Sequence, residues 1–297
     1  MGVATRWLWP LALANLVANI AIVVTGGAVR VTGSGLGCPT WPRCTDESYV
    51  VHGALGIHGA IEFGNRMLTF VLVALALALW VTALVARRRR PLVLATIIVL
   101  GIPLQAVIGG VTVLTDLNPW VVSLHLLVSM AIIGVCVLLV DELRGPERPA
   151  APVRVRRLTW LVFANAWVVL YLGTVVTGSG PHSGDTDARR TGLDPQVMSH
   201  VHAIAVYFLV ALTVGLLVLA HRSGAPLVAR AAGALLVVEL AQGLVGFTQY
   251  FLDLPEVLVV LHLLGAGLVS ATVTWVVASA RQRSSGSIAT ATNSSAR

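Results

Sequence analysis

Eight apolar runs, separated by short polar breaks, dominate the sequence. A bilayer core about 30 Å thick requires roughly 20 consecutive apolar residues per helix, and backbone polar groups in hydrocarbon must be satisfied within the segment. Each run therefore predicts a membrane-spanning helix. The expected spans are 7–29, 57–86, 92–114, 121–142, 158–178, 197–220, 227–250 and 256–280. The predicted fold class is an all-α polytopic membrane protein with eight transmembrane helices.

The first apolar run is expected to be a permanent span. Trp7 to Val29 is too long for the apolar region of a cleaved signal peptide, and seven further spans follow it instead of a soluble domain. Only 11% of the residues are charged and 57% are apolar, which excludes an ordinary soluble domain.

The basic residues give the expected orientation. All twenty are arginines, and fifteen lie on one side of the predicted topology: Arg6, Arg87 to Arg90, Arg144, Arg148, Arg154, Arg156, Arg157, Arg222, Arg230, Arg281, Arg283 and Arg297. The positive-inside rule then places both termini in the cytoplasm of a cell-membrane protein. Because these arginines are dispersed over short loops without interleaved aromatics, the net charge of +7 does not indicate nucleic-acid binding.

The two halves of the sequence resemble each other. Val31–Gly35 recurs as Val176–Gly180 at an offset of 145, Gln105 and Gly109 recur as Gln242 and Gly246 at 137, and Leu124–Leu127 recurs as Leu261–Leu264 at 137. These matches predict a tandem duplication of a four-helix unit, with two parallel-repeat bundles related by an axis along the membrane normal. The expected parts are an amino-terminal half (1–142), a cytoplasmic linker (143–158), a carboxy-terminal half (159–283) and a disordered tail (284–297).

Each half contains one pair of histidines near the outward ends of its spans. His125 and His262 are repeat partners at 137, and we pair His58 with His202 at 144. An ionisable residue inside a span indicates function, and facing histidines in a four-helix bundle are typical haem-iron ligands. Zinc fits poorly without nearby cysteine or carboxylate. Each histidine taken singly could instead bond a neighbouring helix.

The other histidines are weaker candidates. His200 competes with His202 for the ligand role, and the repeat favours His202. His52 and His182 fall in outward loops and His221 at a cytoplasmic helix end, where a solvated role is expected.

Two carboxylates lie within predicted spans. Glu62 follows His58 by one turn and precedes Arg66 by one turn. The Glu62–Arg66 pair could simply tether helices, or Glu62 could handle protons or charge beside the first histidine pair. Glu239 has no neighbouring motif, and both interpretations remain open for it.

Two cysteines lie six residues apart in the first outward loop. Cys38 and Cys44 flank two prolines in a compartment that is oxidising on this topology, so a disulfide is expected. The bridge could be a staple or a redox-active pair. Cys136 in the fourth span is interpreted as a small buried apolar residue.

These motifs together resemble the haem A synthase family of membrane enzymes, over all eight spans. The resemblance rests on the Thr-Gly-Ser-Gly closings of spans one and five, Gly180–Asp185, the cysteine pair, Glu62 with Arg66, and the two His-Leu-Leu segments of spans four and eight.

The resemblance implies a division of labour. Haem B would lie in the carboxy-terminal half between His202 and His262, and the substrate haem O in the amino-terminal half. A ring methyl of haem O would be oxidised to a formyl by successive hydroxylations with loss of water, giving haem A for terminal oxidases. Glu62 aligns with a glutamate regarded as catalytic. Implied partners are a haem O synthase and an unidentified electron donor, besides the lipid bilayer; a homo-oligomer is compatible.

One position departs from the family. Many members have Glu-x-x-His-Arg in the second span, whereas this chain has Asn65 in the histidine's place. His58 lies two turns earlier on the same helix face, and we hypothesise that it replaces the missing ligand opposite His125. Arg30 and Arg66 could pair with haem propionates, or could lie at the membrane interface.

Two functions of other classes compete with the enzyme. A bis-histidine b-type electron-transfer subunit would keep both haems permanently, although both pairs lie near one surface. A transporter is supported only by the internal repeat, because Pro103 in span three has no counterpart in span seven.

Overall fold

The computed structural model describes residues 3–186 and 188–283, and these form eight long α-helices and one short 3-10 helix. The helices are α1 (Val3–Val31), α2 (Gly56–Val85), α3 (Arg89–Leu114), α4 (Pro119–Arg144), α5 (Val153–Ser179), α6 (Pro195–Arg222), α7 (Pro226–Phe251) and α8 (Glu256–Ala280), with the 3-10 turn at Gly53–Leu55. All eight are long and apolar enough to cross a membrane. The predicted fold class is therefore confirmed.

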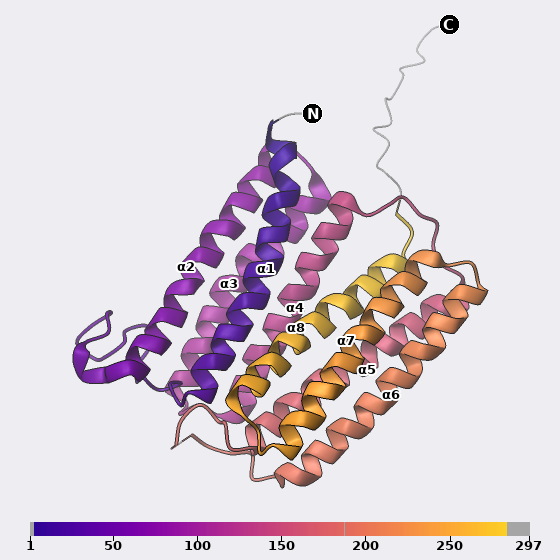
Figure 1. The fold of residues 1–297 in the computed structure, drawn as a ribbon. Coiled ribbons are helices and arrows are strands. Elements are labelled where there is room, and N and C mark those ends of the chain that lie inside the picture. Colours follow the sequence, from indigo (N-terminus) through magenta and orange to yellow (C-terminus); the bar gives the residue numbers. More distant parts are fainter. Residues whose placement is uncertain (1–2, 187, 284–297) are drawn as a thin grey trace, which may run out of the picture.

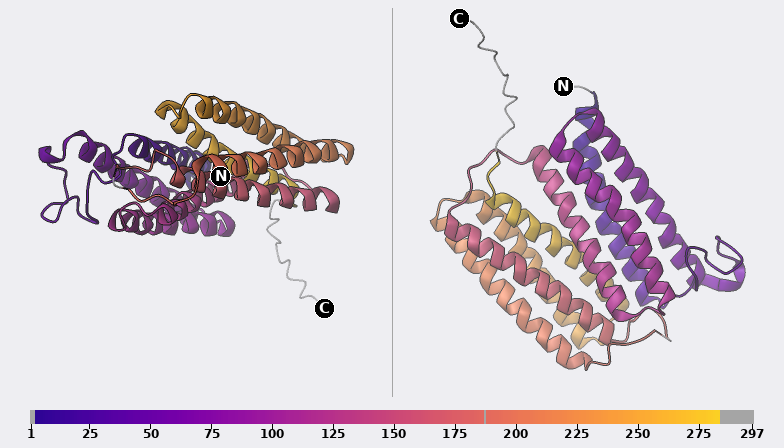
Figure 2. Two further views of the ribbon diagram at one scale, coloured as in Figure 1. Left: turned by 90° about the horizontal axis from the view of Figure 1, so that it is seen from below. Right: turned by 180° about the vertical axis from the view of Figure 1, so that it is seen from behind.

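The helices form two groups of four that lie side by side (Figure 1, Figure 2). In the first group α1 packs on α2 and α4, and α3 on α2 and α4; in the second, α5 packs on α6 and α8, and α7 on α6 and α8. Each group has its own apolar core. A smaller core containing Val23, Met130, Ile133 and Leu170 joins the groups where α1 and α4 meet α5 and α8.

The helix bounds follow the offset seen in the sequence. Adding 137 to the bounds of α3 gives 226–251, the bounds of α7, and α2 and α4 map onto α6 and α8 within two residues. The first helices follow a different offset because segment 32–55 is longer than its counterpart 180–194. This agreement supports the predicted duplication and division into halves, which stay predictions.

Several helices extend beyond the predicted apolar runs. α5 begins at Val153 instead of 158, and α3 at Arg89 instead of 92. The added turns carry Arg154, Arg156 and Arg157 in α5. Long arginine side chains can keep their charged heads in the polar interface while the backbone stays helical, so apolarity alone underestimates helix length.

Both ends of the described chain lie at the same end of the bundles, here called the terminal end, and the opposite end is called the distal end (Figure 1). At the terminal end Arg148 pairs with Asp141 at 2.7 Å and donates to the Ala278 carbonyl at 2.7 Å, joining the linker to α4 and α8. The longer loops, 32–55 and 180–194, occupy the distal end. The expected tail at 284–297 lies outside the described residues, and the cytoplasmic location of the termini stays a prediction.

Candidate functional site

The structure brings His202 of α6 and His262 of α8 together as a facing pair, with their rings in an edge-to-face arrangement. Their ring centroids are 6.5 Å apart and the ring planes cross at 70°. The Nδ1 atoms of both rings are buried without a hydrogen-bond partner. A metal ligated by two imidazoles has metal–nitrogen bonds of about 2 Å, so the ring centroids of such a pair stand roughly 6 Å apart. The observed spacing therefore fits two axial ligands on one iron.

Two glycines make room for these imidazoles. A Cβ at Gly173 of α5 would lie 3.3 Å from Cε1 of His202, and a Cβ at Gly246 of α7 would lie 3.4 Å from Cε1 of His262. A Cβ at Gly173 would be in a tight contact, and a Cβ at Gly246 would be in van der Waals contact, so a larger side chain at either position would press on the imidazole. Glycine at both positions lets all four helices of this bundle approach the histidine pair.

A glutamine fixes the backbone beneath His262. Nε2 of Gln242 on α7 donates to the main-chain carbonyl of His262 at 2.9 Å. A Cβ at Gly265 would collide with the Gln242 side chain, so Gly265 on α8 provides the space for this bond. The glutamine thus locks α7 to α8 at the level of the ligand.

The amino-terminal bundle repeats this frame around His125. Nε2 of Gln105 on α3 donates to the His125 carbonyl at 3.0 Å, and a Cβ at Gly109 would lie 3.2 Å from Cε1 of His125. Nδ1 of His125 is also buried without a partner. The repeat marked Gln105, Gln242, Gly109 and Gly246 in the sequence without giving them a role; their contacts show that they support a histidine.

His58 and His125 differ in their surroundings. His58 is exposed at the distal end of α2, and its Nδ1 is 2.9 Å from Oγ of Ser34. Asn65, two turns further into the bundle, is half-buried and accepts a hydrogen bond from the hydroxyl of Thr25 on α1 at 2.8 Å. The role of His58 as the ligand opposite His125 stays a prediction, and its exposure weighs against it.

Glu62 and Arg66 anchor the cysteine loop to α2. Glu62 is 6% exposed; its Oε2 accepts from the Cys38 N–H at 2.6 Å and its Oε1 pairs with Arg66. Arg66 also donates to the carbonyls of Cys38 at 3.0 Å and Thr40 at 3.0 Å. The pair therefore tethers a loop to a helix, instead of only one helix to another.

The loop that this pair holds lies against the site. Cys38 and Cys44 form the expected disulfide, and both are buried. The Trp41 ring between them lies on α3 so closely that a Cβ at Gly110 would collide with it. Because Gly110 adjoins the glycine that contacts His125, Trp41 covers α3 at the level of that histidine.

Arg30 links the two halves at the distal end. Its guanidinium donates to the carbonyls of Thr177, at 2.9 Å, and His182. Nearby, the Gly35 N–H donates to the Gly184 carbonyl at 2.8 Å, joining segments 32–55 and 180–194. The bonds of Arg30 and Arg66 to loop carbonyls do not test the predicted pairing with haem propionates.

The remaining histidines lie away from the facing pair. His200 is exposed, with its ring 6.3 Å from that of Tyr250, and His52 and His221 are also exposed. His182 bonds the Leu254 carbonyl through Nε2 at 2.9 Å.

Two further buried groups stand apart from the histidines. Glu239 is 3% exposed, and its Oε1 accepts from the Thr213 hydroxyl at 2.8 Å. Cys136 is fully buried, as expected for a small apolar side chain.

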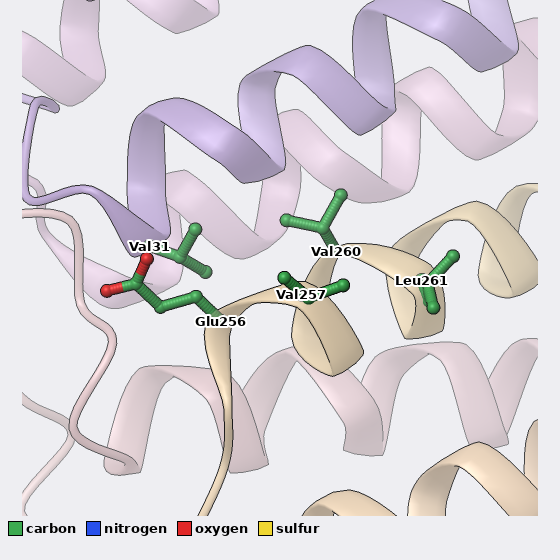
Figure 3. Close-up of a pocket in the computed structure, with 5 residues that line it drawn as sticks. All are labelled: Val31, Glu256, Val257, Val260 and Leu261. Carbon is green, nitrogen blue, oxygen red and sulfur yellow. The ribbon is translucent and has the colours of Figure 1, made fainter.

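A hollow of about 240 Å³ lies between α1 and α8 near the distal end (Figure 3). Val31, Val257, Val260 and Leu261 line it, with Glu256 at one side. One of its lining residues, Leu261, adjoins His262 in sequence, but none of the predicted ligands lines the hollow. The hollow is therefore not the candidate haem site.

A model of one protein family matches the chain. The family is described as cytochrome oxidase assembly protein (COX15-CtaA), and the matched residues are 7–54 and 57–182, more than half of the chain. The chain belongs to this family. The match includes His125 and Glu62, whereas His202 and His262 lie beyond it, so their assignment depends on the repeat and on their geometry.

Curated relatives carry the name haem A synthase. The chain is 31% identical to the Staphylococcus haemolyticus protein over 57% of each chain, and 34% identical to the Bacillus pumilus protein over 52% of this chain and 54% of that one. It is 30% identical to the Bacillus licheniformis protein over 46% of this chain and 47% of that one. The chain spans about half the length of the curated relatives it matches.

Proposed function

We propose that this protein is a haem A synthase, which oxidises a ring methyl of haem O to a formyl group to give haem A for terminal oxidases. Family membership and the names of the relatives support the reaction class. The observation that carries the proposal is the facing pair of His202 and His262, at a spacing that fits one iron. The two bundles also differ, because the Glu62–Arg66 pair and the disulfide loop belong to the amino-terminal bundle and the facing histidines to the carboxy-terminal bundle. This difference suits an enzyme with one resident haem and one substrate haem.

Haem B is the proposed resident cofactor of the carboxy-terminal bundle. The donor set fits it, because two half-buried imidazoles, whose Nδ1 atoms are buried without a partner, lie next to each other beside two glycines. When bound, haem supplies redox chemistry that side chains lack. His202 and His262 would hold it, while Gln242 keeps α8 in register with α7.

Haem O is the proposed substrate of the amino-terminal bundle, with His125 as its ligand. Gln105 and Gly109 orient this imidazole as their counterparts orient His262. Trp41 covers α3 next to it and would limit the entry of water from the distal end. Arg30 and Arg66 are the proposed partners of haem propionates.

Glu62 is the proposed catalytic acid–base group. It is buried and is held by Arg66 and by the Cys38 N–H, so its carboxylate has a fixed position near the site. A fixed carboxylate can accept the proton released when a methyl C–H bond is oxidised. The Cys38–Cys44 bridge holds the loop that supplies one of these contacts.

The proposed partners are a haem O synthase that delivers the substrate and an unidentified electron donor. The proposed setting is the cell membrane, with both termini in the cytoplasm. A homo-oligomer remains compatible with the exposed apolar helix surfaces, which a bilayer also covers.

The function can be tested by identifying the haems that the protein carries. The chain would be expressed in a host that makes haem O but no haem A, purified in detergent, and its extracted porphyrins identified by mass and chromatography. We expect haem B together with haem A or its hydroxylated precursor. Haem B alone, at two per chain and unchanged with time, would instead identify a b-type electron-transfer subunit.

A further inference from the structure

The position equivalent to His202 in the amino-terminal bundle is occupied by Asn65. The 137-residue displacement that takes α3 onto α7 and His125 onto His262 takes Asn65 onto His202. The displacement of 144 that pairs His58 with His202 does not fit the helix bounds. At 137, His58 corresponds to Pro195, the first residue of α6.

The contacts of Asn65 agree with this correspondence. A Cβ at Gly26 of α1 would lie 4.0 Å from Asn65 Nδ2, and a Cβ at Gly173 of α5 would lie 3.3 Å from the His202 ring, although these two glycines are not repeat partners at the offset of 145. Each side chain thus leaves the second helix of its bundle and meets a glycine of the first. The Thr25 hydroxyl holds the Asn65 amide in place.

An asparagine is a poor substitute for an axial histidine. Haem iron in proteins is held by histidine, cysteine, methionine or tyrosine side chains, whereas a neutral amide is a weak ligand. Oδ1 of Asn65 already accepts from Thr25, which leaves the two N–H donors of Nδ2. Within the described part of the chain, no acceptor is recorded for them.

His58 is too far along α2 to take the same place. Seven residues of helix rise by about 10 Å, so His58 lies roughly that far toward the distal end from Asn65. The imidazole bonds Ser34, and the backbone beneath it is packed so closely that a Cβ at Gly37 would collide with the His58 carbonyl. The distal loop therefore holds His58 in position outside the bundle.

We infer that the amino-terminal bundle gives its haem iron a single protein ligand, His125, and that Asn65 faces an open coordination position opposite it. This inference rests on the proposed function, because it concerns the substrate haem. A small neutral molecule such as water, dioxygen or carbon monoxide could occupy the open position and accept a hydrogen bond from Asn65 Nδ2. The carboxy-terminal bundle, with two histidines, has no such position.

The test uses spectroscopy of the intact protein instead of turnover. Protein from a host that makes only haem B would carry that haem in both bundles. We expect each chain to carry two different haems. One should be six-coordinate, low-spin and unable to bind carbon monoxide, and the other should be five-coordinate, high-spin and able to bind it. Electron paramagnetic resonance and carbon monoxide difference spectra report the two spin states and the ligand binding.

A reciprocal exchange provides matched variants. Asn65→His should convert the high-spin haem to low spin and lower its carbon monoxide binding at least tenfold. His202→Asn should do the reverse in the other bundle, while His58→Ala should leave both spin states unchanged. Two low-spin haems in the unaltered protein, with one becoming high spin in His58→Ala, would overturn the inference and assign His58 as the ligand.

The failure of this inference differs from the failure of the proposed function. Two low-spin haems together with haem A formation would remove the single-histidine site and leave the enzyme. A carbon monoxide-binding second haem without any porphyrin oxidation would do the opposite. A chain that holds no second haem even in a host that makes haem O would remove both.

Discussion

The two bundles share one frame and differ in what completes it. In each, a glutamine bonds the carbonyl of a histidine and a glycine on the same helix makes room for the ring: Gln105 and Gly109 for His125, Gln242 and Gly246 for His262. The carboxy-terminal bundle has a second imidazole, His202, beside that histidine, and the 137-residue displacement places the amide of Asn65 at the corresponding position of the amino-terminal bundle. Two histidine ligands would suit the proposed permanent haem, whereas a single histidine ligand would suit the proposed substrate haem, which must react and leave.

The two bundles also differ at their distal ends, in the ion pair and in the loop that each carries. Glu62 and Arg66 correspond at 137 to Ser199 and Ala203, two side chains that cannot form an ion pair with each other. That pair holds the disulfide loop, which has no counterpart in the shorter segment 180–194. Glu62, the proposed acid–base group, and the disulfide loop with Trp41 both belong to the bundle proposed to bind substrate.

The largest expected effect comes from removing one histidine of the facing pair. His262→Ala should lower haem B retained by the carboxy-terminal bundle more than tenfold, because one axial ligand is lost and a cavity replaces it. The haem-to-protein ratio after purification measures this. The matched control is His200→Ala, which should keep the haem; loss of haem in His200→Ala but not in His202→Ala would assign the ligand to His200.

The next effect separates catalysis from tethering in the amino-terminal bundle. Glu62→Gln keeps an oxygen that can accept from Cys38 and Arg66 but cannot take a proton, so haem A formation should fall about a hundredfold. Haem occupancy should stay unchanged. If Glu62→Gln retains activity while Arg66→Ala loses it, the pair serves only to hold the loop.

A smaller effect should follow from filling the glycine positions one bundle at a time. Gly246→Val should crowd His262 and lower haem retention in the carboxy-terminal bundle alone by about tenfold, consistent with an overpacking cost of about 1–3 kcal/mol. Gly109→Val should act only on the other bundle. Gly243→Val is the control, because a Cβ at Gly243 on α7 would have nothing within 4 Å. Equal losses of haem from Gly243→Val and Gly246→Val would contradict the role of Gly246 in making room for His262.

The smallest effect concerns the glutamines. Gln242→Ala removes one hydrogen bond to the His262 carbonyl, a net loss of about 1 kcal/mol, so haem affinity should fall roughly fivefold. Gln105→Ala should produce a similar loss in the other bundle, measured by haem titration of each variant. A loss of haem affinity in the bundle that does not carry the substitution would show that the two haem sites are not independent.

The sequence alone was sufficient for the fold and for part of the site. Eight apolar runs gave eight helices, and the cysteine spacing gave the Cys38–Cys44 bridge. The sequence analysis also placed His202 and His262 together as the histidine pair of the carboxy-terminal half, and the structure brings their rings within 6.5 Å of each other. These features depend on local apolarity and on spacing within one chain segment, which a sequence displays directly.

The rest depends on contacts between segments distant in sequence. The anchoring of the cysteine loop by Glu62 and Arg66 could not be inferred from their i,i+4 spacing, which indicated only that they face each other. The correspondence between Asn65 and His202 was obscured because the distal loops differ in length and shift the offset of the first helix. Arg30 likewise bonds a loop about 150 residues away.

The measurement that most directly tests the two-bundle account is a time course of porphyrin composition per chain, in protein loaded with haem B and haem O. The account predicts that one haem per chain remains haem B throughout while the second changes from haem O through a hydroxylated form to haem A, and that His125→Ala abolishes only the second. Two haems that both stay unchanged, or that both become oxidised, would contradict the division into a permanent and a substrate site.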